Sequence, residues 1–242
     1  MMEYSEKKVN LTEFAYQSTR VVVTPYLKKH FNPIILNKDF IPKDGRGIIY
    51  APNHRSTLDP FAVTTGIEDT IHWAALKRFF DAEDSIFNNS KNPLLCQLTK
   101  YMFKTLGFIP IDREAANLEA LRLMSKFLKD CRNIGIFPEG TTNKHPDQYD
   151  LGEVKPGLSI IARKNDAWIQ PISLVWIKDK RIANRVIINF REPFLSTGNK
   201  KGITDLWTSE VQEGIRQNKE LISSLTQVAD TSEGKRISLQ IK

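Results

Sequence analysis

The chain has 242 residues, of which 40% are hydrophobic and 26% charged, a composition typical of a globular protein and not of a disordered one. Its formal net charge of +7 would suit an anionic partner, but the basic residues are dispersed and no nucleic-acid-binding motif is present, so we do not expect nucleic acid to be bound. Cys96 and Cys131 are the only cysteines, too few for a disulfide framework or a paired-cysteine metal site, which favours a reducing compartment.

Residues 1–40 are expected to form an N-terminal amphipathic helical segment. Residues 11–31 combine apolar side chains with Arg20, Lys28 and Lys29, and Pro25 predicts an interruption, giving one or two helices. Two placements remain open. The segment could lie as an anchor on an anionic membrane surface, or it could pack on the rest of the protein. We see no secretory signal and no apolar run approaching the roughly 18 residues that a membrane span requires.

From residue 41 onward, short apolar runs alternate with longer segments of helical period. This predicts an α/β fold with a mixed, largely parallel central sheet flanked by helices, spanning residues 41–225, and a polar, flexible tail over 226–242. The predicted strands cover residues 47–51, 70–75, 107–111, 133–137, 169–177 and 185–190. The predicted helices cover residues 60–66, 77–87, 93–106, 114–131, 157–164 and 203–224.

The predicted helix over 93–106 has the clearest ends. Asn92 is placed to cap its start, and Gly107 is placed to stop it. Its apolar residues on one face are expected to pack in the core; they are Leu94, Leu98, Tyr101 and Met102.

The segment Asn53–Pro60 (NHRSTLDP) follows the first predicted strand of the domain and pairs a histidine with a carboxylate. An imidazole is suited to taking a proton near neutral pH, and a carboxylate on its other nitrogen fixes its tautomer. On one continuous helix His54 and Asp59 would point about 140° apart, so a pairing requires a strand-to-helix turn here. Pro60 fits the first turn of such a helix, but Asp59 could instead serve only as its N-cap.

Two later strand ends carry further polar groups. The strand over 107–111 leads into Asp112 and Arg113, whose guanidinium suits a phosphate, although the two residues could also form a surface ion pair. The strand over 133–137 leads into Glu139, Gly140 and Thr141, which offer an acceptor, close backbone approach and a hydroxyl for a polyol, or merely a turn.

The last block of the pattern is the strand over 169–177. Pro171 within it predicts an edge, a bulge or an irregular stretch beside a site.

These blocks, in this order, resemble the glycerolipid acyltransferases, and in particular the 1-acyl-glycerol-3-phosphate acyltransferases. The resemblance covers residues 41–193 and includes, besides the motifs above, Ile41–Gly45, Lys77, Lys155–Gly157 and Ile169–Ile172. It implies transfer of a fatty acyl group from acyl-CoA or acyl carrier protein to the free hydroxyl of 1-acyl-glycerol 3-phosphate (lysophosphatidic acid). The product would be phosphatidic acid, made for phospholipid biosynthesis by a cytoplasmic protein peripheral on the inner face of a membrane, without a cofactor.

The resemblance also implies roles for single residues. His54 would be the catalytic base and Asp59 its orienting partner. Acceptor binding would involve Arg113 at the phosphate together with Glu139, Gly140 and Thr141. The family often places an arginine after the Glu-Gly-Thr block, where this chain has Thr142, Asn143 and Lys144. Phosphate recognition would therefore also use a lysine, for which the candidates are Lys77, Lys144 and Lys155.

Several alternatives remain open. Within the family, the acceptor could be glycerol 3-phosphate, another lysophospholipid or another amphipathic alcohol. A hydrolase would use the same histidine to activate water on a thioester or ester, and a non-catalytic lipid-surface module would leave the pair structural. A covalent acyl-enzyme is not favoured, since Ser56 is the only close nucleophile. No metal site is expected, because the other histidines, His30, His72 and His145, are scattered.

Overall fold

A computed structural model describes residues 6–81, 83, 92–112, 118–143, 150–177, 185–196 and 199–230. In these residues an eight-stranded sheet has the order β1-β7-β6-β2-β5-β3-β4, with β8 pairing with β6 outside this path. The strands are β1 (Ile34–Leu36), β2 (Ile48–Pro52), β3 (Ile71–Leu76), β4 (Ile109–Ile111), β5 (Asn133–Gly135), β6 (Trp168–Ile177), β7 (Arg185–Phe190) and β8 (Phe194–Leu195).

The sheet is mixed and largely parallel, as predicted. Strands β6, β2, β5, β3 and β4 pair in parallel, as do β1 and β7, whereas β7 and β8 run antiparallel to β6. The ends of the five parallel strands therefore meet at one side of the sheet, which we call the carboxyl edge. Pro171 lies inside the continuous strand β6 and pairs in register with Ala51 of β2, while on the other side of β6 it faces the gap between β7 and β8.

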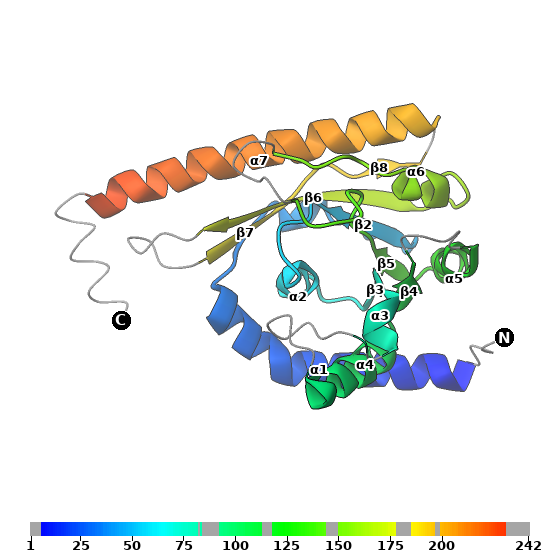
Figure 1. Cartoon of the computed structure of the whole chain (residues 1–242). Helices are drawn as coiled ribbons and strands as arrows, with labels where there is room; N and C mark the ends of the chain where they lie inside the picture. Colours follow the sequence, from blue (N-terminus) through cyan, green and yellow to red (C-terminus); the bar gives the residue numbers. More distant parts are fainter. Residues whose placement is uncertain are drawn as a thin grey trace.

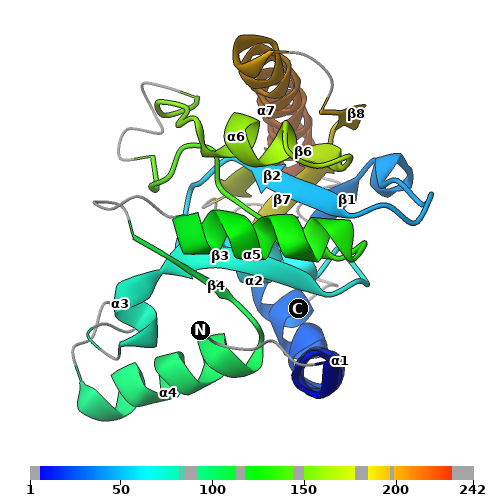
Figure 2. The same cartoon turned by 90° about the vertical axis from the view of Figure 1, so that its right-hand side faces the viewer.

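Helices cover both faces of the sheet (Figures 1 and 2). They are α1 (Glu6–Phe31), the 3₁₀ turn η1 (Lys38–Phe40), α2 (Asp59–Thr64), α3 (Lys77–Phe80), α4 (Pro93–Thr105), α5 (Leu118–Lys129), α6 (Gly157–Ala162) and α7 (Lys200–Asp230). One apolar cluster joins the sheet to α1, α2, α3 and α4, and a second joins it to α5, α6 and α7. Burial of both clusters supplies the main driving force for this three-layer fold.

The predicted strands all occur, with no end shifted by more than two residues. Strands β1 and β8 are additional, and β1 brings residues from the predicted N-terminal segment into the sheet beside β7. Helix α7 is longer than predicted at both ends. The predicted helix over 77–87 is too long, because α3 ends at Phe80 and residues 81 and 83 are not helical. Residues 82 and 84–87 of that predicted helix, the predicted helical residues 114–117, and residues 231–242 of the predicted tail lie outside the described residues.

Helix α1 packs on the domain with one face. Tyr16 and Phe31 are buried, and Thr70, just before β3, donates a hydrogen bond to Glu13 (2.5 Å). The predicted interruption at Pro25 is wrong, because α1 continues through this residue. Pro25 and Val21 are both exposed, so water can reach the backbone carbonyl that loses its intrahelical partner.

Helix α4 begins as predicted, since the Asn92 side chain accepts hydrogen bonds from the amides of the first helical turn. The expectation that its apolar face packs in the core is wrong for three of the four residues. Leu94 is 77% exposed, Leu98 49% and Tyr101 69%. The reason is that α4 turns a different stripe inward, which consists of Cys96, Thr99 and Phe103.

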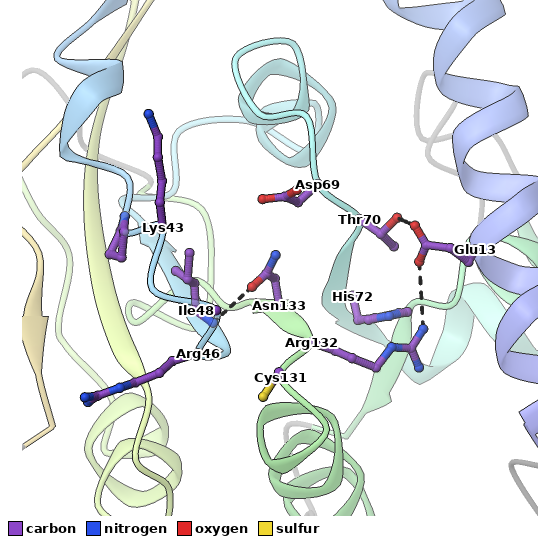
Figure 3. Close-up of a pocket in the computed structure, with 12 residues that line it drawn as sticks. Glu13, Lys43, Arg46, Ile48, Asp69, Thr70, His72, Cys131, Arg132 and Asn133 are labelled. Atoms are coloured by element: carbon purple, nitrogen blue, oxygen red, sulfur yellow. Dashed lines mark hydrogen bonds and ion pairs between the residues drawn. The ribbon is translucent and has the colours of Figure 1, made fainter.

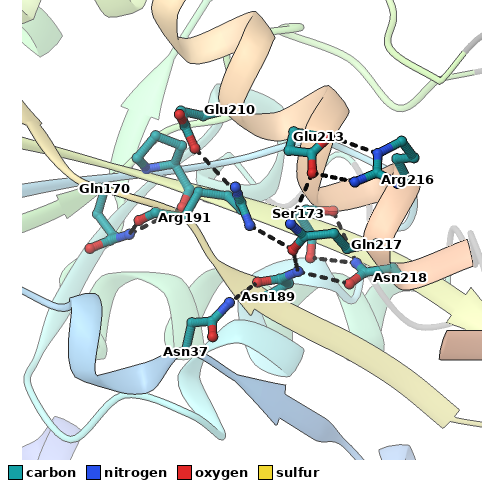
Figure 4. A network of polar contacts seen from close by, with 11 residues as sticks. Asn37, Gln170, Ser173, Asn189, Arg191, Glu210, Glu213, Arg216, Gln217 and Asn218 are labelled. Atoms are coloured by element: carbon teal, nitrogen blue, oxygen red, sulfur yellow. Dashed lines mark hydrogen bonds and ion pairs between the residues drawn. The ribbon is translucent and has the colours of Figure 1, made fainter. Parts of the chain in front are cut away.

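Helix α7 is joined to the sheet by a buried polar network (Figure 4). The Asn218 amide donates to the backbone oxygen and the hydroxyl of Ser173 on β6 (3.3 and 3.0 Å), and Asn189 on β7 donates to Asn218 (3.1 Å). All three side chains are fully buried. Because buried amides are costly to leave unpaired, this network fixes the register of α7 against the carboxyl-terminal half of β6.

Candidate active site

His54 and Asp59 lie together at the carboxyl edge. His54 follows the end of β2 and Asp59 is the first residue of α2, so the strand-to-helix turn that the sequence predicts is present. His54 Nδ1 lies 2.9 Å from Asp59 Oδ2, and the carboxylate side chain is fully buried whereas the imidazole is 14% exposed. A carboxylate can only accept, so Nδ1 carries the proton and Nε2 is left with a free lone pair. This is the arrangement of a general base.

Asp59 is held by further donors. Its Oδ2 also accepts from the backbone amides of Arg55 (2.6 Å) and Ser56 (2.8 Å), and its Oδ1 accepts from the indole of Trp176 (2.7 Å). The alternative in which Asp59 serves as N-cap is wrong, because Leu58 occupies that position and no side chain caps α2. The carboxylate instead closes the turn that precedes the helix, and its two oxygens accept hydrogen bonds from four donors.

The side chain of Asn53 anchors the backbone immediately before His54 to strand β6. This side chain is fully buried, accepts from the backbone amide of Leu174 (2.6 Å) and donates to the carbonyl of the same residue (3.1 Å). The backbone amide of Asn53 also donates to Ile172 (3.3 Å). The pairing of β2 with β6 is thus extended by a side chain at the point where the chain turns toward His54.

An aromatic column supports the imidazole from one side. The ring of Phe137, which follows β5, stacks on that of His54 with 4.0 Å between centroids, and Trp73 on β3 stacks on Phe137 at 5.3 Å. Gly135 makes room for this column, because a Cβ at this position would lie 2.2 Å from the Trp73 ring. Stacking restricts rotation of the imidazole and leaves its plane fixed by Phe137 and Asp59 together.

Glu139 is buried and binds two backbone segments. Its Oε1 accepts from the amide of His54 (2.6 Å) and its Oε2 from the amide of Gly152 (2.5 Å). Burial raises the pKa of Glu139, and the two amide hydrogen bonds oppose that rise. The carboxylate therefore joins the loop of the base to the loop that precedes α6. Its contribution to acceptor binding stays a prediction.

The segment after Glu139 lies against the same loop. The Asn143 amide donates to the carbonyl of His54 (2.9 Å), and the Lys155 amide donates to the carbonyl of Pro138 (2.8 Å). Gly140 has φ +67°, and a Cβ there would lie 3.3 Å from Cγ of Lys155. Thr141 is exposed. The structure thus brings Gly140, Thr141 and Lys155 into the surroundings of His54.

The remaining predicted phosphate ligands are only partly described. Lys77 is exposed and follows β3 directly. Leu76 pairs with Ile111 on β4, so the chain that leads to Arg113 leaves the sheet beside Lys77 at the carboxyl edge. Arg113 and Lys144 themselves lie outside the described residues.

A polar recess of about 480 Å³ lies elsewhere, at the amino-terminal ends of the strands (Figure 3). Its lining includes Ile48, Asn133 and His72, which stand at the start of β2, β5 and β3. His72 is buried with Nδ1 2.9 Å from the carbonyl of Gly107, and burial lowers its pKa to about 4. This recess lies at the opposite end of the parallel strands from His54, which follows the end of β2.

Comparison with known proteins identifies the class. A family model of acyltransferases matches residues 33–175, more than half of the chain, and the chain therefore belongs to the acyltransferase family. Among solved structures, it is similar to the 1-acyl-sn-glycerophosphate (LPA) acyltransferase PlsC from Thermotoga maritima. The TM-score is 0.61 and the identity 19%, with 90% of this chain and 84% of that chain covered. No match is found among curated proteins. The predicted family and fold class are confirmed.

Two side chains that hold the pair have no predicted role in the site. Trp176 and Phe137 lie within the predicted strands over 169–177 and 133–137. Neither carries a local sequence signal, because each reaches the pair through tertiary structure. Asn53 stands next to His54 in the motif, and its role is visible only from its partner on β6.

Proposed function

We propose that this acyltransferase moves a fatty acyl group from a thioester, acyl-CoA or acyl carrier protein, to the free hydroxyl of 1-acyl-glycerol 3-phosphate, forming phosphatidic acid for phospholipid biosynthesis. The observation that carries the proposal is the pair of His54 and Asp59, with Nδ1 on the buried carboxylate and Nε2 without a hydrogen-bond partner among the described residues. The similar fold of PlsC, an LPA acyltransferase, supports the choice of acceptor.

The proposed reaction is direct transfer. Nε2 of His54 takes the proton of the acceptor hydroxyl while its oxygen bonds to the thioester carbonyl carbon. The tetrahedral intermediate then collapses, the carbon–sulfur bond breaks, and the leaving thiolate takes the proton from the imidazolium. Base catalysis of this kind contributes about 10²-fold to 10⁴-fold in rate, and Asp59 stabilises the imidazolium.

Substrate contacts are assigned by residue type and position. We assign the glycerol phosphate to Arg113, aided by Lys77 or Lys155, because guanidinium and ammonium groups bind phosphate. Glu139, Gly140 and Thr141 are assigned to the acceptor side. Lys155 Nζ lies 2.5 Å from Glu153 Oε2, so a phosphate there would replace an exposed ion pair, which is worth little.

We further propose that the protein works as a peripheral protein on the cytoplasmic face of an anionic membrane, through residues 1–40 and α4. Exposed Phe14, Val21 and Tyr26 on α1 and exposed Leu94, Leu98 and Tyr101 on α4 support this assignment. The two helices lie at the same end of the molecule, opposite α7 (Figure 1). Helix α4 carries lysines and no acidic residue, and basic residues add roughly 1 kcal/mol each near anionic lipid. No helix in the described residues is both long and apolar enough to cross a bilayer.

The activity is tested on purified protein with lipid vesicles, against both thioester donors and a panel of phosphorylated and neutral acceptors. We expect donor consumption that depends on 1-acyl-glycerol 3-phosphate and disappears in His54→Ala. In Arg113→Ala, the apparent KM for the phosphorylated acceptor should rise while that for a neutral one changes little. Donor consumption without any acceptor would indicate a hydrolase, and vesicle binding without turnover would indicate a lipid-surface module.

The membrane assignment is tested with a matched pair of variants. Leu98 on α4 and Leu206 on α7 are exposed to nearly the same extent, 49% and 50%, and the two helices lie at opposite ends of the molecule (Figure 1). Leu98→Glu should weaken co-sedimentation with vesicles of anionic phospholipid, whereas Leu206→Glu should not. Equal vesicle binding by both variants would show that α4 is not part of the membrane-binding surface.

A further inference from the structure

The second oxygen of Asp59 is held by a tryptophan. Oδ2 accepts from His54 and two backbone amides, whereas Oδ1 accepts from the Trp176 indole at 2.7 Å. In the described residues no other donor to Oδ1 is found. Rotation about the Cβ–Cγ bond of Asp59 moves both carboxylate oxygens together, so a donor on Oδ1 opposes the same rotation that the donors on Oδ2 oppose. The indole therefore helps to fix the plane of the carboxylate, and through it the direction in which the imidazole is held.

Trp176 is itself placed by rigid neighbours. Two residues before it, the backbone amide and carbonyl of Leu174 both form hydrogen bonds with the Asn53 side chain. Three residues before it, Ser173 accepts a hydrogen bond from Asn218 in the buried network of α7 (Figure 4). The Trp176 ring meets Phe31 of α1 edge to face, with 5.3 Å between centroids. Strand β6 and the end of α1 thus fix the indole while its N–H points at Asp59.

We propose that Trp176 is a positioning residue for acyl transfer, which orients His54 through the Asp59 carboxylate and connects the end of α1 to the base. This inference rests on the proposed function, because its main readout is acyl transfer. It adds a residue that touches no reacting atom but determines how often the imidazole is aligned when the hydroxyl arrives. Misalignment of a reacting group by about 1 Å can cost 10²-fold in rate.

The chain offers a matched control on the same strand. Trp168, at the other end of β6, donates from its indole to the Asp44 carboxylate at 2.9 Å, in an exposed position. Trp168→Phe and Trp176→Phe each remove one indole–carboxylate hydrogen bond while keeping an aromatic ring. Only the second bond reaches Asp59.

The test compares kcat and KM of the full-length wild type and both variants in the vesicle assay. In Trp176→Phe, kcat should fall about 10-fold to 100-fold, with KM for donor and acceptor within about twofold, and Trp168→Phe should match the wild type. Trp176→His, which keeps a ring N–H, should retain more activity than Trp176→Phe. Urea denaturation and circular dichroism establish whether each variant is folded. If Trp176→Phe is unfolded, Trp176→His is compared with the wild type in its place.

A double-mutant cycle separates positioning from general destabilisation. If Trp176 acts through Asp59, its replacement should reduce kcat by less than about twofold in an Asp59→Asn background. An equal loss in both backgrounds would overturn the proposal, as would a Trp176→Phe enzyme as active as Trp168→Phe. Absence of acyl transfer by the wild type with every donor and acceptor would instead overturn the proposed function.

Discussion

Asn53 offers a sharp test of how the site is held. In Asn53→Ala, the amide and the carbonyl of Leu174 both lose their partner in a fully buried position. Each buried backbone group left unpaired costs about 1 to 3 kcal/mol. We therefore expect the free energy of unfolding to fall by about 2 to 6 kcal/mol. Because the substitution frees the backbone next to His54, kcat should fall by about 10-fold or more in molecules that remain folded.

The measurement combines urea denaturation at low temperature with the acyl-transfer assay. Asn165→Ala is the control, since Asn165 is also buried and its amide also makes two hydrogen bonds, with Ser125 (2.7 Å) and Ile161 (2.7 Å), remote from His54. It should lose stability yet keep its kcat. The reasoning is refuted if Asn53→Ala unfolds within about 1 kcal/mol of the wild type, or if both variants lose kcat equally.

The remaining predictions concern pH and a close contact. The pKa of His72 falls from 6.5 to about 4 through burial, so its neutral form favours the folded state above pH 6.5 and this contribution disappears as pH falls toward 4. The loss should reach about 3 kcal/mol, and the slope in urea denaturation between these pH values should flatten in His72→Gln; an unchanged slope would contradict the assignment. A Cβ on Gly152 would lie 2.8 Å from Glu139 Oε2, whereas one on Gly157 meets nothing within 4 Å. Gly152→Ala should therefore lower kcat several-fold while Gly157→Ala does not, and equal kinetics would show that the Glu139 contact is dispensable.

The sequence predicts the strands that form the centre of the sheet because their apolar runs are long and bounded by turn residues. It does not predict β1 or β8, since a three-residue and a two-residue strand carry no period, and each exists only because a longer strand is available as partner. Helix α4 shows a second limit. Spacing places Leu94, Leu98 and Tyr101 on one face, but only the packing of α4 shows that this face is exposed.

The site follows the same pattern. The order of motifs along the chain was sufficient to predict that His54 pairs with Asp59, because both lie in one short segment and the turn between them has its own sequence signal. The Trp176 indole and the Asn53 clamp could not be predicted, since each contact joins residues more than a hundred positions apart. Such contacts depend on strand register, which a single sequence does not specify.

These long sequence separations affect when the site can form during translation. His54 and Asp59 are five positions apart in the sequence. The residues that support this loop are synthesised much later: Glu139 comes 85 positions after His54, Trp176 117 positions after Asp59, and Leu174 121 positions after Asn53. A nascent chain that has not yet exposed β6 therefore holds both chemical groups without the frame that aligns them. Catalytic competence should emerge late in translation, and chains released early should be inert although they contain the whole first motif.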